Sequence, residues 1–328
     1  MPEGLSFTSM KKKNSRDNRS VTAVVFGYHN IGYSCLKTLL KRGVRVALVV
    51  THEDDPREQI WFKSVSRLAA RHRIPVITPD GPNVPEVVRR IEQAKPDVIF
   101  SFYYRCMISP EILRIPPMGA FNMHGSLLPA YRGRCPVNWV LVHGEKRTGV
   151  TIHHMTEKPD RGNVVAQKAV PIRQSDTALT LFNRITRAAP PVLEQFLRLM
   201  AGGRLEGKPQ DQRKASYFGG RKPQDGRIDW NRSAQDVYNL VRAVTHPYPG
   251  AFTEKDGRKL FIWWGTPVRG KVSGIPGTVA GIRGGKVAVV TGGGTFIVHK
   301  ASSEGGPEMK AGTVFKANGV AVGDRLGV

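Results

Sequence analysis

The sequence predicts an α/β fold with two parts: a doubly wound, mostly parallel sheet, followed by a small antiparallel β-barrel. Two observations carry this prediction. Between residues 21 and 155, short strands rich in β-branched residues alternate with helical patterns, which is typical of parallel sheets with helices on both faces. Beyond residue 225, short strands are separated by glycine turns, which is typical of antiparallel barrels.

The first part is expected to alternate between strands and helices. Strands are predicted over residues 21–27, 44–52, 75–80, 97–104, 119–124 and 149–155, and helices over 31–43, 61–74, 84–96 and 135–144. A long helix over 177–200 closes this part. We expect it to break or kink at Pro190 and Pro191, because proline removes a helical hydrogen bond and its ring clashes with the preceding turn.

The pattern changes in the basic stretch of residues 201–225, which contains glycine and proline and is interpreted as a linker. A helix over 233–244 then leads into strands over 259–268, within 277–301 and over 323–328. We therefore expect three regions. They are a basic, disordered tail (1–20), an α/β domain (21–208) and a β domain (209–328).

The formal net charge of +24 is the strongest feature of the composition. It favours an anionic partner: nucleic acid, a membrane surface or a phosphorylated small molecule. The positive charge is spread along the chain, so a generally basic surface explains it equally well. No apolar run approaches the roughly 18–20 residues that span a bilayer, so no membrane insertion is expected.

The three cysteines are Cys35, Cys106 and Cys135. An odd number with no C-x-x-C spacing argues against a disulfide framework and against a cysteine zinc site. The first twenty residues also lack the apolar stretch of a secretory signal. These features predict a protein of the reducing cytoplasm.

Two short motifs do not support the chemistry that they first suggest. The stretch FGYHNIG (26–32) follows the first predicted strand but lacks both the dinucleotide and the P-loop patterns, so it is interpreted as a tight turn. His153 and His154 are adjacent on a predicted strand. Their side chains therefore point to opposite faces and are poorly placed to share a metal ion. No metal site is predicted.

Asn122 and His124 are the strongest candidates for a catalytic site. They share one face of a predicted strand, close to its carboxyl end, where active sites of parallel sheets lie. An amide can donate to a developing oxyanion and an imidazole can exchange a proton near neutral pH. Asp160, just after the next predicted strand, is expected to reach His124 because both strands end at the same edge, and to stabilise the imidazolium. No serine or cysteine is placed as a nucleophile, which favours direct attack by a substrate amine. A buried core histidine remains an alternative interpretation of His124.

These residues lie within a set of ordered motifs. They are N-x-H-x-S-L-L-P (122–129), Y-R-G (131–133), T-G-V-T (148–151) and D-x-G (160–162). In this order the sequence resembles the 10-formyltetrahydrofolate-dependent formyltransferases, from about Val21 to the C-terminus. The resemblance implies a Rossmann-like catalytic domain, an OB-like C-terminal domain and 10-formyltetrahydrofolate as co-substrate. The likeness is greatest to the branch formed by the formyltransferase domain of bifunctional polymyxin-resistance enzymes, through FSFYYR (100–105) and RAVTHPYPGAF (242–252).

The resemblance also implies roles for individual residues. Asn122 would hold the formyl oxygen, His124 would act as general acid and base, and Asp160 would raise the pKa of His124. A further set would contact the formyl-folate: Arg134, Thr156, Glu157, Lys158, Pro159 and Asp160, with Tyr103 and Tyr104 as candidates for the pterin pocket. The acceptor expected from this branch is UDP-4-amino-4-deoxy-L-arabinose, in lipid A modification and polymyxin resistance.

Alternatives to this acceptor remain open. Methionyl-tRNA formyltransferases are similar across both domains, and a charge of +24 would suit tRNA. Arg134 within RGRCPV (132–137) favours the sugar, because the tRNA enzymes typically have RGAAPI-like residues there. A noncatalytic RNA-binding module is a third hypothesis, against which the intact Asn-His-Asp set argues. The polymyxin-resistance enzymes continue into an NAD-dependent decarboxylase domain, so that step is expected from a separate protein.

Overall fold

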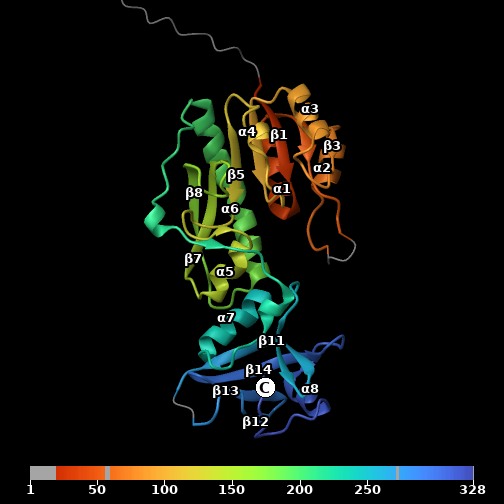
Figure 1. The fold of residues 1–328 in the computed structure, drawn as a ribbon, viewed down its shortest axis with the longest axis vertical. Coiled ribbons are helices and arrows are strands. Elements are labelled where there is room, and N and C mark those ends of the chain that lie inside the picture. Colours follow the sequence, from red (N-terminus) through yellow and green to blue (C-terminus); the bar gives the residue numbers. More distant parts are fainter. Residues whose placement is uncertain (1–19, 56–59, 271–272, 328) are drawn as a thin grey trace, which may run out of the picture.

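A computed structural model describes residues 20–55, 60–270 and 273–327. Except for Ser20, the predicted basic tail lies outside the described residues. The chain is elongated, with a mixed sheet and its helices in one half and an antiparallel sheet in the other (Figure 1). Among the described residues, none of the helices has the length and apolar character needed to cross a membrane.

The first half is built on a seven-stranded sheet in the order β3-β2-β1-β4-β5-β7-β8. Neighbouring strands from β3 to β5 pair in parallel, whereas β7 is antiparallel to both β5 and β8. The predicted doubly wound, mostly parallel sheet is therefore confirmed. Its strands are β1 (Thr22–Gly27), β2 (Arg45–Val50), β3 (Val76–Ile77), β4 (Val98–Phe102), β5 (Ala120–His124), β7 (Arg147–His154) and β8 (Val164–Pro171).

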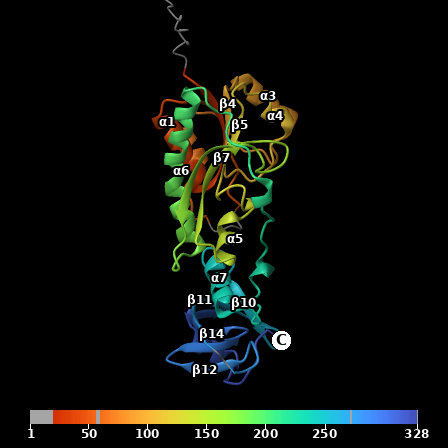
Figure 2. The ribbon, with the colours of Figure 1, turned by 90° about the vertical axis from the view of Figure 1, so that its left-hand side faces the viewer.

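Helices cover both faces of this sheet, as Figures 1 and 2 show. Val25 and Phe100 belong to a buried cluster with α1, α2 and α6, whereas Val24 and Ile99 belong to a second cluster with α3 and α4. Alternate residues of one strand thus serve opposite faces. The helices of this half are α1 (His29–Lys41), α2 (Val65–Arg71), α3 (Pro85–Ala94), α4 (Pro110–Leu113), α5 (Pro136–Val142) and α6 (Ala178–Ala201).

The predicted break in the long helix is wrong, because α6 runs unbroken through Pro190 and Pro191. Thr177 caps its first turn with a hydroxyl that accepts from the backbone N–H of Thr180. Buried side chains on both sides of the proline pair, among them Ala189 and Val192, pack α6 against the sheet. This packing offsets the roughly 3 kcal/mol that a proline costs in a helix interior. The sequence analysis also missed β8, whose burial pattern does not alternate regularly.

The linker returns along the first half before it enters the second (Figure 2). Its strand β9 (Tyr217–Phe218) pairs in parallel with β6 (Arg132–Gly133), flanked by the short helices η1 (Gln212–Lys214) and η2 (Pro223–Gly226). Helix α7 (Ala234–Val244) then packs on α5, where the buried amide of Asn138 donates to the carbonyl oxygen of Ala243 at 2.7 Å. This contact joins the two halves.

The second half is an antiparallel sheet in the order β10-β11-β14-β13-β12, with β15 paired to β14. The predicted strand over 323–328 is wrong: in its described part, Arg325 forms only an isolated bridge to Thr278. Gly323 and Gly327 have φ angles of +97° and +76°, so the backbone turns there instead of extending. The elements are β10 (Ala251–Lys255), β11 (Arg258–Val268), β12 (Val279–Arg283), β13 (Lys286–Thr291), β14 (Gly294–Ser303), β15 (Met309–Lys310) and α8 (Ala311–Ala317).

Candidate active site

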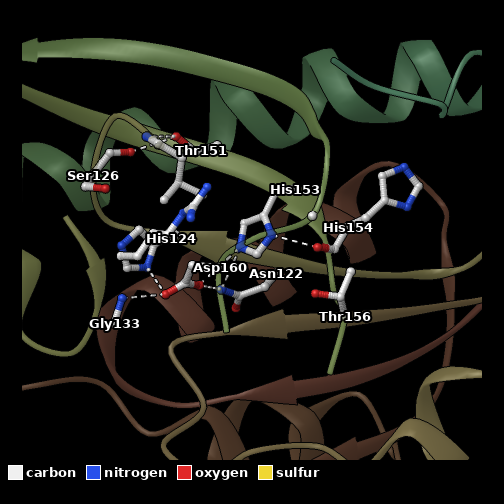
Figure 3. Close-up of polar contacts among 12 residues, drawn as sticks. Asn122, His124, Ser126, Gly133, Thr151, His153, His154, Thr156 and Asp160 are labelled. Carbon is white, nitrogen blue, oxygen red and sulfur yellow. Dashed lines mark hydrogen bonds and ion pairs between the residues drawn. The ribbon is translucent and has the colours of Figure 1, made fainter. Parts of the chain in front are cut away.

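The structure brings Asn122, His124 and Asp160 together at the carboxyl end of β5 (Figure 3). Asn122 Nδ2 lies 3.3 Å from Asp160 Oδ1, and His124 Nδ1 lies 3.5 Å from Asp160 Oδ2. The side chains of His124 and Asp160 are only 7% and 10% exposed. An amide, an imidazole and a carboxylate thus share one largely buried site.

Asp160 does not reach His124 by the predicted route. Because β7 is antiparallel to β5, it ends opposite the start of β5, with His154 paired to Phe121. The loop that follows therefore has to fold back toward His124. Two backbone features permit this turn: Asp160 has a φ of +55°, and a Cβ at Gly162 would lie 2.0 Å from the carbonyl oxygen of His154. Only glycine fits at position 162.

Four groups hold the carboxylate of Asp160. Besides Asn122 and His124, the backbone N–H of Gly133 donates to Oδ2 at 2.8 Å and His153 Nε2 lies 3.3 Å from Oδ1. Burial alone would raise the pKa of Asp160. The charge of His124 and the hydrogen bonds from His153 and Gly133 outweigh burial and hold this pKa below its ordinary value. Asp160 is therefore a carboxylate at neutral pH.

His153 is a site residue that the sequence analysis missed. It pairs directly with Asn122 across β5 and β7, and its Nε2 lies 3.2 Å from Asn122 Nδ2. Its Nδ1 lies 2.7 Å from the carbonyl oxygen of His154, so Nδ1 carries a proton. Nε2 accepts from Asn122 when the ring is neutral, and donates to Asp160 Oδ1 when the ring is protonated. The sequence analysis considers His153 only as half of a metal pair. Placing the strand over 149–155 beside that over 119–124 would have put one of the two histidines on the face of Asn122.

The orientation of the His124 ring is fixed by its other nitrogen. Nε2 lies 2.6 Å from the carbonyl oxygen of Tyr131 and donates to it, which leaves Nδ1 facing Asp160. Two hydroxyls hold the chain between these residues: Ser126 Oγ donates to the carbonyl oxygen of Ala130, and Thr151 Oγ1 donates to that of Ser126 (Figure 3). Nδ1 is thus the ring nitrogen available for proton exchange at the site.

The two tyrosines predicted for the pterin pocket lie on different faces of the sheet. The strand β4 ends at Phe102, and Tyr103 follows with a φ of +59°. Its hydroxyl is buried, accepts or donates no hydrogen bond among the described residues, and lies beside Gly125. Tyr104 instead stacks on His52, with ring centroids 4.2 Å apart, and packs with the cluster on the other face. Only Tyr103 adjoins the residues around His124.

The loop of residues 156–159 and Arg134, which were predicted to contact the folate, lie in different surroundings. Thr156, Glu157 and Lys158 line a pocket of about 570 Å³, which also includes Arg114 and Arg161. Pro159 lies in the same loop, next to Asp160. Arg134 is exposed and packs against the linker, where a Cβ added at Gly220 would lie 3.6 Å from its guanidinium group. The pocket volume falls within the range usual for small-molecule sites.

The part of the chain that the structure describes contains no group of three or more histidine, cysteine or acidic residues that could hold a metal ion. His153 and His154 have different partners: Nε2 of His154 contacts the carbonyl oxygen of Leu205, whereas His153 faces Asp160. Figure 3 shows His154 pointing away from the site.

Residues 21–197 match the family model described as "Formyl transferase", and residues 221–319 match "Formyl transferase, C-terminal domain". The first match covers more than half of the chain. Together with the sheet topology, these matches confirm the predicted fold class.

Three solved structures illustrate the similarity. HypX from Aquifex aeolicus, in complex with tetrahydrofolic acid, has a TM-score of 0.61 at 18% identity, over 92% of this chain and 48% of that chain. An N-formyltransferase from Helicobacter canadensis, in complex with folinic acid and dTDP-3-aminofucose, has a TM-score of 0.62 at 20% identity, over 85% of this chain and 98% of that chain. WlaRD, described as a sugar 3N-formyl transferase and solved with dTDP and 5-N-formyl-THF, has a TM-score of 0.64 at 19% identity, over 87% of this chain and 98% of that chain. At these identities the likeness shows the fold, and this chain spans about half the length of the HypX structures.

Proposed function

Because this chain belongs to the formyl transferase family, we propose that it transfers a formyl group from 10-formyltetrahydrofolate to the amine of a nucleotide-linked amino sugar. The observation that carries the proposal is the Asn122–His124–Asp160 arrangement, in which an oxyanion donor and a proton carrier share one anchored carboxylate. No covalent enzyme intermediate is needed, since the acceptor amine is itself a nucleophile.

Asn122 supplies the hydrogen bond that the formyl oxygen needs as it gains negative charge. Its Nδ2 now contacts Asp160 Oδ1 at 3.3 Å and His153 Nε2 at 3.2 Å, both at the long end of the hydrogen-bond range. The N–H that faces the imidazole of His153 can therefore turn to the charged oxyanion at little cost, while the other N–H remains on the carboxylate of Asp160.

His124 moves the proton that the reaction releases. The acceptor nitrogen bonds to the formyl carbon, the bond from that carbon to the folate nitrogen breaks, and one proton passes from the amine to the folate nitrogen. Nδ1 of His124 takes and returns this proton, since Nε2–H is held by the carbonyl oxygen of Tyr131. Asp160 stabilises the imidazolium formed in between.

The residues present fit a folate co-substrate. The pocket beside the Asp160 loop is lined by Arg114, which pairs with Glu157 at 3.6 Å, and by Lys158 and Arg161. The positive charges of Lys158 and Arg161 suit the glutamate carboxylates of a folate. The hydroxyl of Tyr103 lies beside Gly125, has no hydrogen-bond partner among the described residues, and can bind a polar group of either substrate.

Within the class of nucleotide-linked amino sugars we propose UDP-4-amino-4-deoxy-L-arabinose, which would place the protein in lipid A modification and polymyxin resistance. The support is the sequence motifs 100–105, 132–137 and 242–252 that resemble this branch. A net charge of +24 suits a substrate with a diphosphate. The same charge favours methionyl-tRNA as the second candidate acceptor.

Release of tetrahydrofolate from 10-formyltetrahydrofolate tests the proposal. The assay is run with UDP-4-amino-4-deoxy-L-arabinose, with a dTDP-linked amino sugar and with methionyl-tRNA. Turnover with a nucleotide sugar and none with tRNA supports the proposed acceptor class, and the two sugars decide between nucleotides. Turnover only with tRNA refutes it in favour of the second candidate.

A further inference from the structure

The helices on the two faces of the first sheet differ in charge. On one face, α1, α2 and α6 carry a single acidic residue, Glu194, and a set of basic ones: Lys37, Lys41, Arg67, Arg71, Arg184, Arg187 and Arg198. On the other face, α3 and α4 carry more acidic than basic residues: Glu86, Glu92 and Glu111 against Arg89 and Arg90. A generally basic surface would make the helices of both faces positive. The positive charge of these helices is therefore confined to one side.

The acidic residue of this side does not offset its charge, because Glu194 pairs with Arg42 at the end of α1. Arg184 in turn pairs with Asp176. The remaining cations are exposed, and among the described residues no carboxylate lies within ion-pairing distance of them. We call these residues the basic face: Lys37, Lys41, Arg67, Arg71, Arg187 and Arg198.

Helix geometry directs the basic face to one side of the molecule. Residues four apart are neighbours on a helix surface, which applies to the pair on α1 and to the pair on α2. Arg187 and Arg198 are separated by about three turns of α6 and so return to the same side. Helix α1 packs against both α2 and α6 and lies between them (Figure 1). The buried sides of all three helices face the sheet, which leaves the basic residues directed outward.

The basic face extends away from the active site. Strands β1, β2 and β8 run in the same direction, and the helices that follow them run back along the sheet. The last turns of these helices, with Lys41, Arg71 and Arg198, therefore lie at the amino edge of the sheet, opposite the carboxyl end of β5. Cations in a last turn also favour the helix dipole. Lys37, Arg67 and Arg187 lie before the last turns, so the dipole does not account for the whole face.

This side of the protein has charge but few other means of recognition. Among the described residues, none of the exposed large hydrophobic side chains belongs to α1, α2 or α6. Protein partners usually bind around an apolar core, and single-stranded nucleic acids stack on aromatic side chains. A second copy of the same face would be repelled by its like charge. An anionic membrane surface, in contrast, attracts clusters of four to eight lysines and arginines through charge alone.

We propose that the basic face docks this protein reversibly on an anionic membrane surface, without insertion. The inference goes beyond the proposed function and does not depend on the acceptor. Because the cations lie on the outer side of α1, α2 and α6, docking leaves the opposite edge of the sheet open to substrates. Since the attraction is electrostatic and between exposed charges, it is lost at high salt.

The test is co-sedimentation of the full chain with phosphatidylcholine vesicles, with and without phosphatidylglycerol, at low and at high salt. The wild type should bind only the vesicles that contain phosphatidylglycerol, and only at low salt. A triple variant removes one charge from the last turn of each helix: Lys41→Gln, Arg71→Gln and Arg198→Gln. It should bind about 100-fold more weakly, because each cation near an anionic surface contributes about fivefold.

The matched control removes the same charge elsewhere, from exposed residues of α3 and β12: Arg89→Gln, Arg90→Gln and Arg283→Gln. Its binding should stay within about threefold of the wild type, because these charges lie on the opposite face of the sheet or in the second half (Figure 1). Both triple variants should release tetrahydrofolate at wild-type rates, since they leave the Asn122–His124–Asp160 site unchanged. Thermal unfolding curves show that each is folded.

Each other outcome overturns the inference. A wild type that does not bind the anionic vesicles has no such docking surface. Equal losses in the two triple variants would mean that net charge acts without a particular face. Methionyl-tRNA binding that needs Lys41, Arg71 and Arg198, while vesicle binding does not, would assign the face to RNA. Because vesicle binding is measured without turnover, these results stand apart from the outcome for the proposed function.

Discussion

The imidazole of His153 lies between the two other polar partners of the site: its Nε2 is 3.2 Å from the amide nitrogen of Asn122 and 3.3 Å from Oδ1 of Asp160. This link depends on the antiparallel register of β5 and β7, which sets His153 opposite Asn122. Under the proposed mechanism His153 contacts groups that act on the substrate, and we propose it as a positioning residue.

Replacing His153 by phenylalanine should lower kcat about 10- to 100-fold, the usual result of a small misplacement of catalytic groups. Its hydrogen bond also helps to hold the pKa of Asp160 low, so the acidic limb of the pH profile of kcat/KM should move to higher pH. His154→Phe is the matched control, since that ring contacts the carbonyl oxygen of Leu205 and not the site. Equal profiles for the two variants would exclude the positioning role.

Direct removal of the catalytic groups should be more severe. His124→Ala is expected to lower kcat about 100- to 10,000-fold, because the proton carrier is lost. Asn122→Ala should lower it about 100- to 1,000-fold, as is usual for an oxyanion donor. Stopped-flow or steady-state release of tetrahydrofolate measures both, with circular dichroism as the check on folding. Wild-type rates from a folded His124→Ala protein would refute the mechanism.

The low pKa of Asp160 predicts how stability depends on pH. A carboxylate with a pKa below its unfolded value of roughly 4 stabilises the folded state above that pH, and this contribution is lost as the pH falls through the folded pKa. The free energy of unfolding should therefore fall more steeply below about pH 5 in the wild type than in Asp160→Asn. Urea unfolding between pH 3 and 7 measures it. Parallel curves would show that Asp160 is not held in this way.

Most of the first half could be predicted because strands and helices there have clear periodicity. The predicted helix over 61–74 begins only at Val65, since the Ser64 hydroxyl accepts from the N–H of Arg67 and starts the helix there. Helix α6 shows where local preference fails. Pro190 and Pro191 predict a break, but the packing of α6 against the rest of the protein keeps the helix continuous.

The sequence predicts that Asn122, His124 and Asp160 lie together, but it does not predict their geometry. The side-chain period of two within a single strand is enough to predict that Asn122 and His124 share one face. Asp160 was chosen correctly as a neighbour of His124 but for the wrong reason, because strand direction depends on the whole sheet. The positions of His153 and of the linker strand β9 depend on pairings between distant segments, which a single sequence does not reveal.

A double-mutant cycle can test whether the Tyr103 hydroxyl occupies the space beside His124. A Cβ added at Gly125 would lie 2.1 Å from Tyr103 Oη and 3.2 Å from its Cζ, so Gly125→Ala forces a buried hydroxyl to move. We expect Gly125→Ala to lower the free energy of unfolding by about 1–3 kcal/mol, as is usual for an overpacked core. The midpoint of thermal unfolding and kcat should both fall as well. In the background of Tyr103→Phe the nearest atom is gone, so the same substitution should cost much less. The four proteins of the cycle give the coupling energy, which should be of the order of 0.5–3 kcal/mol for residues in contact. Strictly additive effects would mean that the hydroxyl does not face Gly125, and would remove Tyr103 from the site.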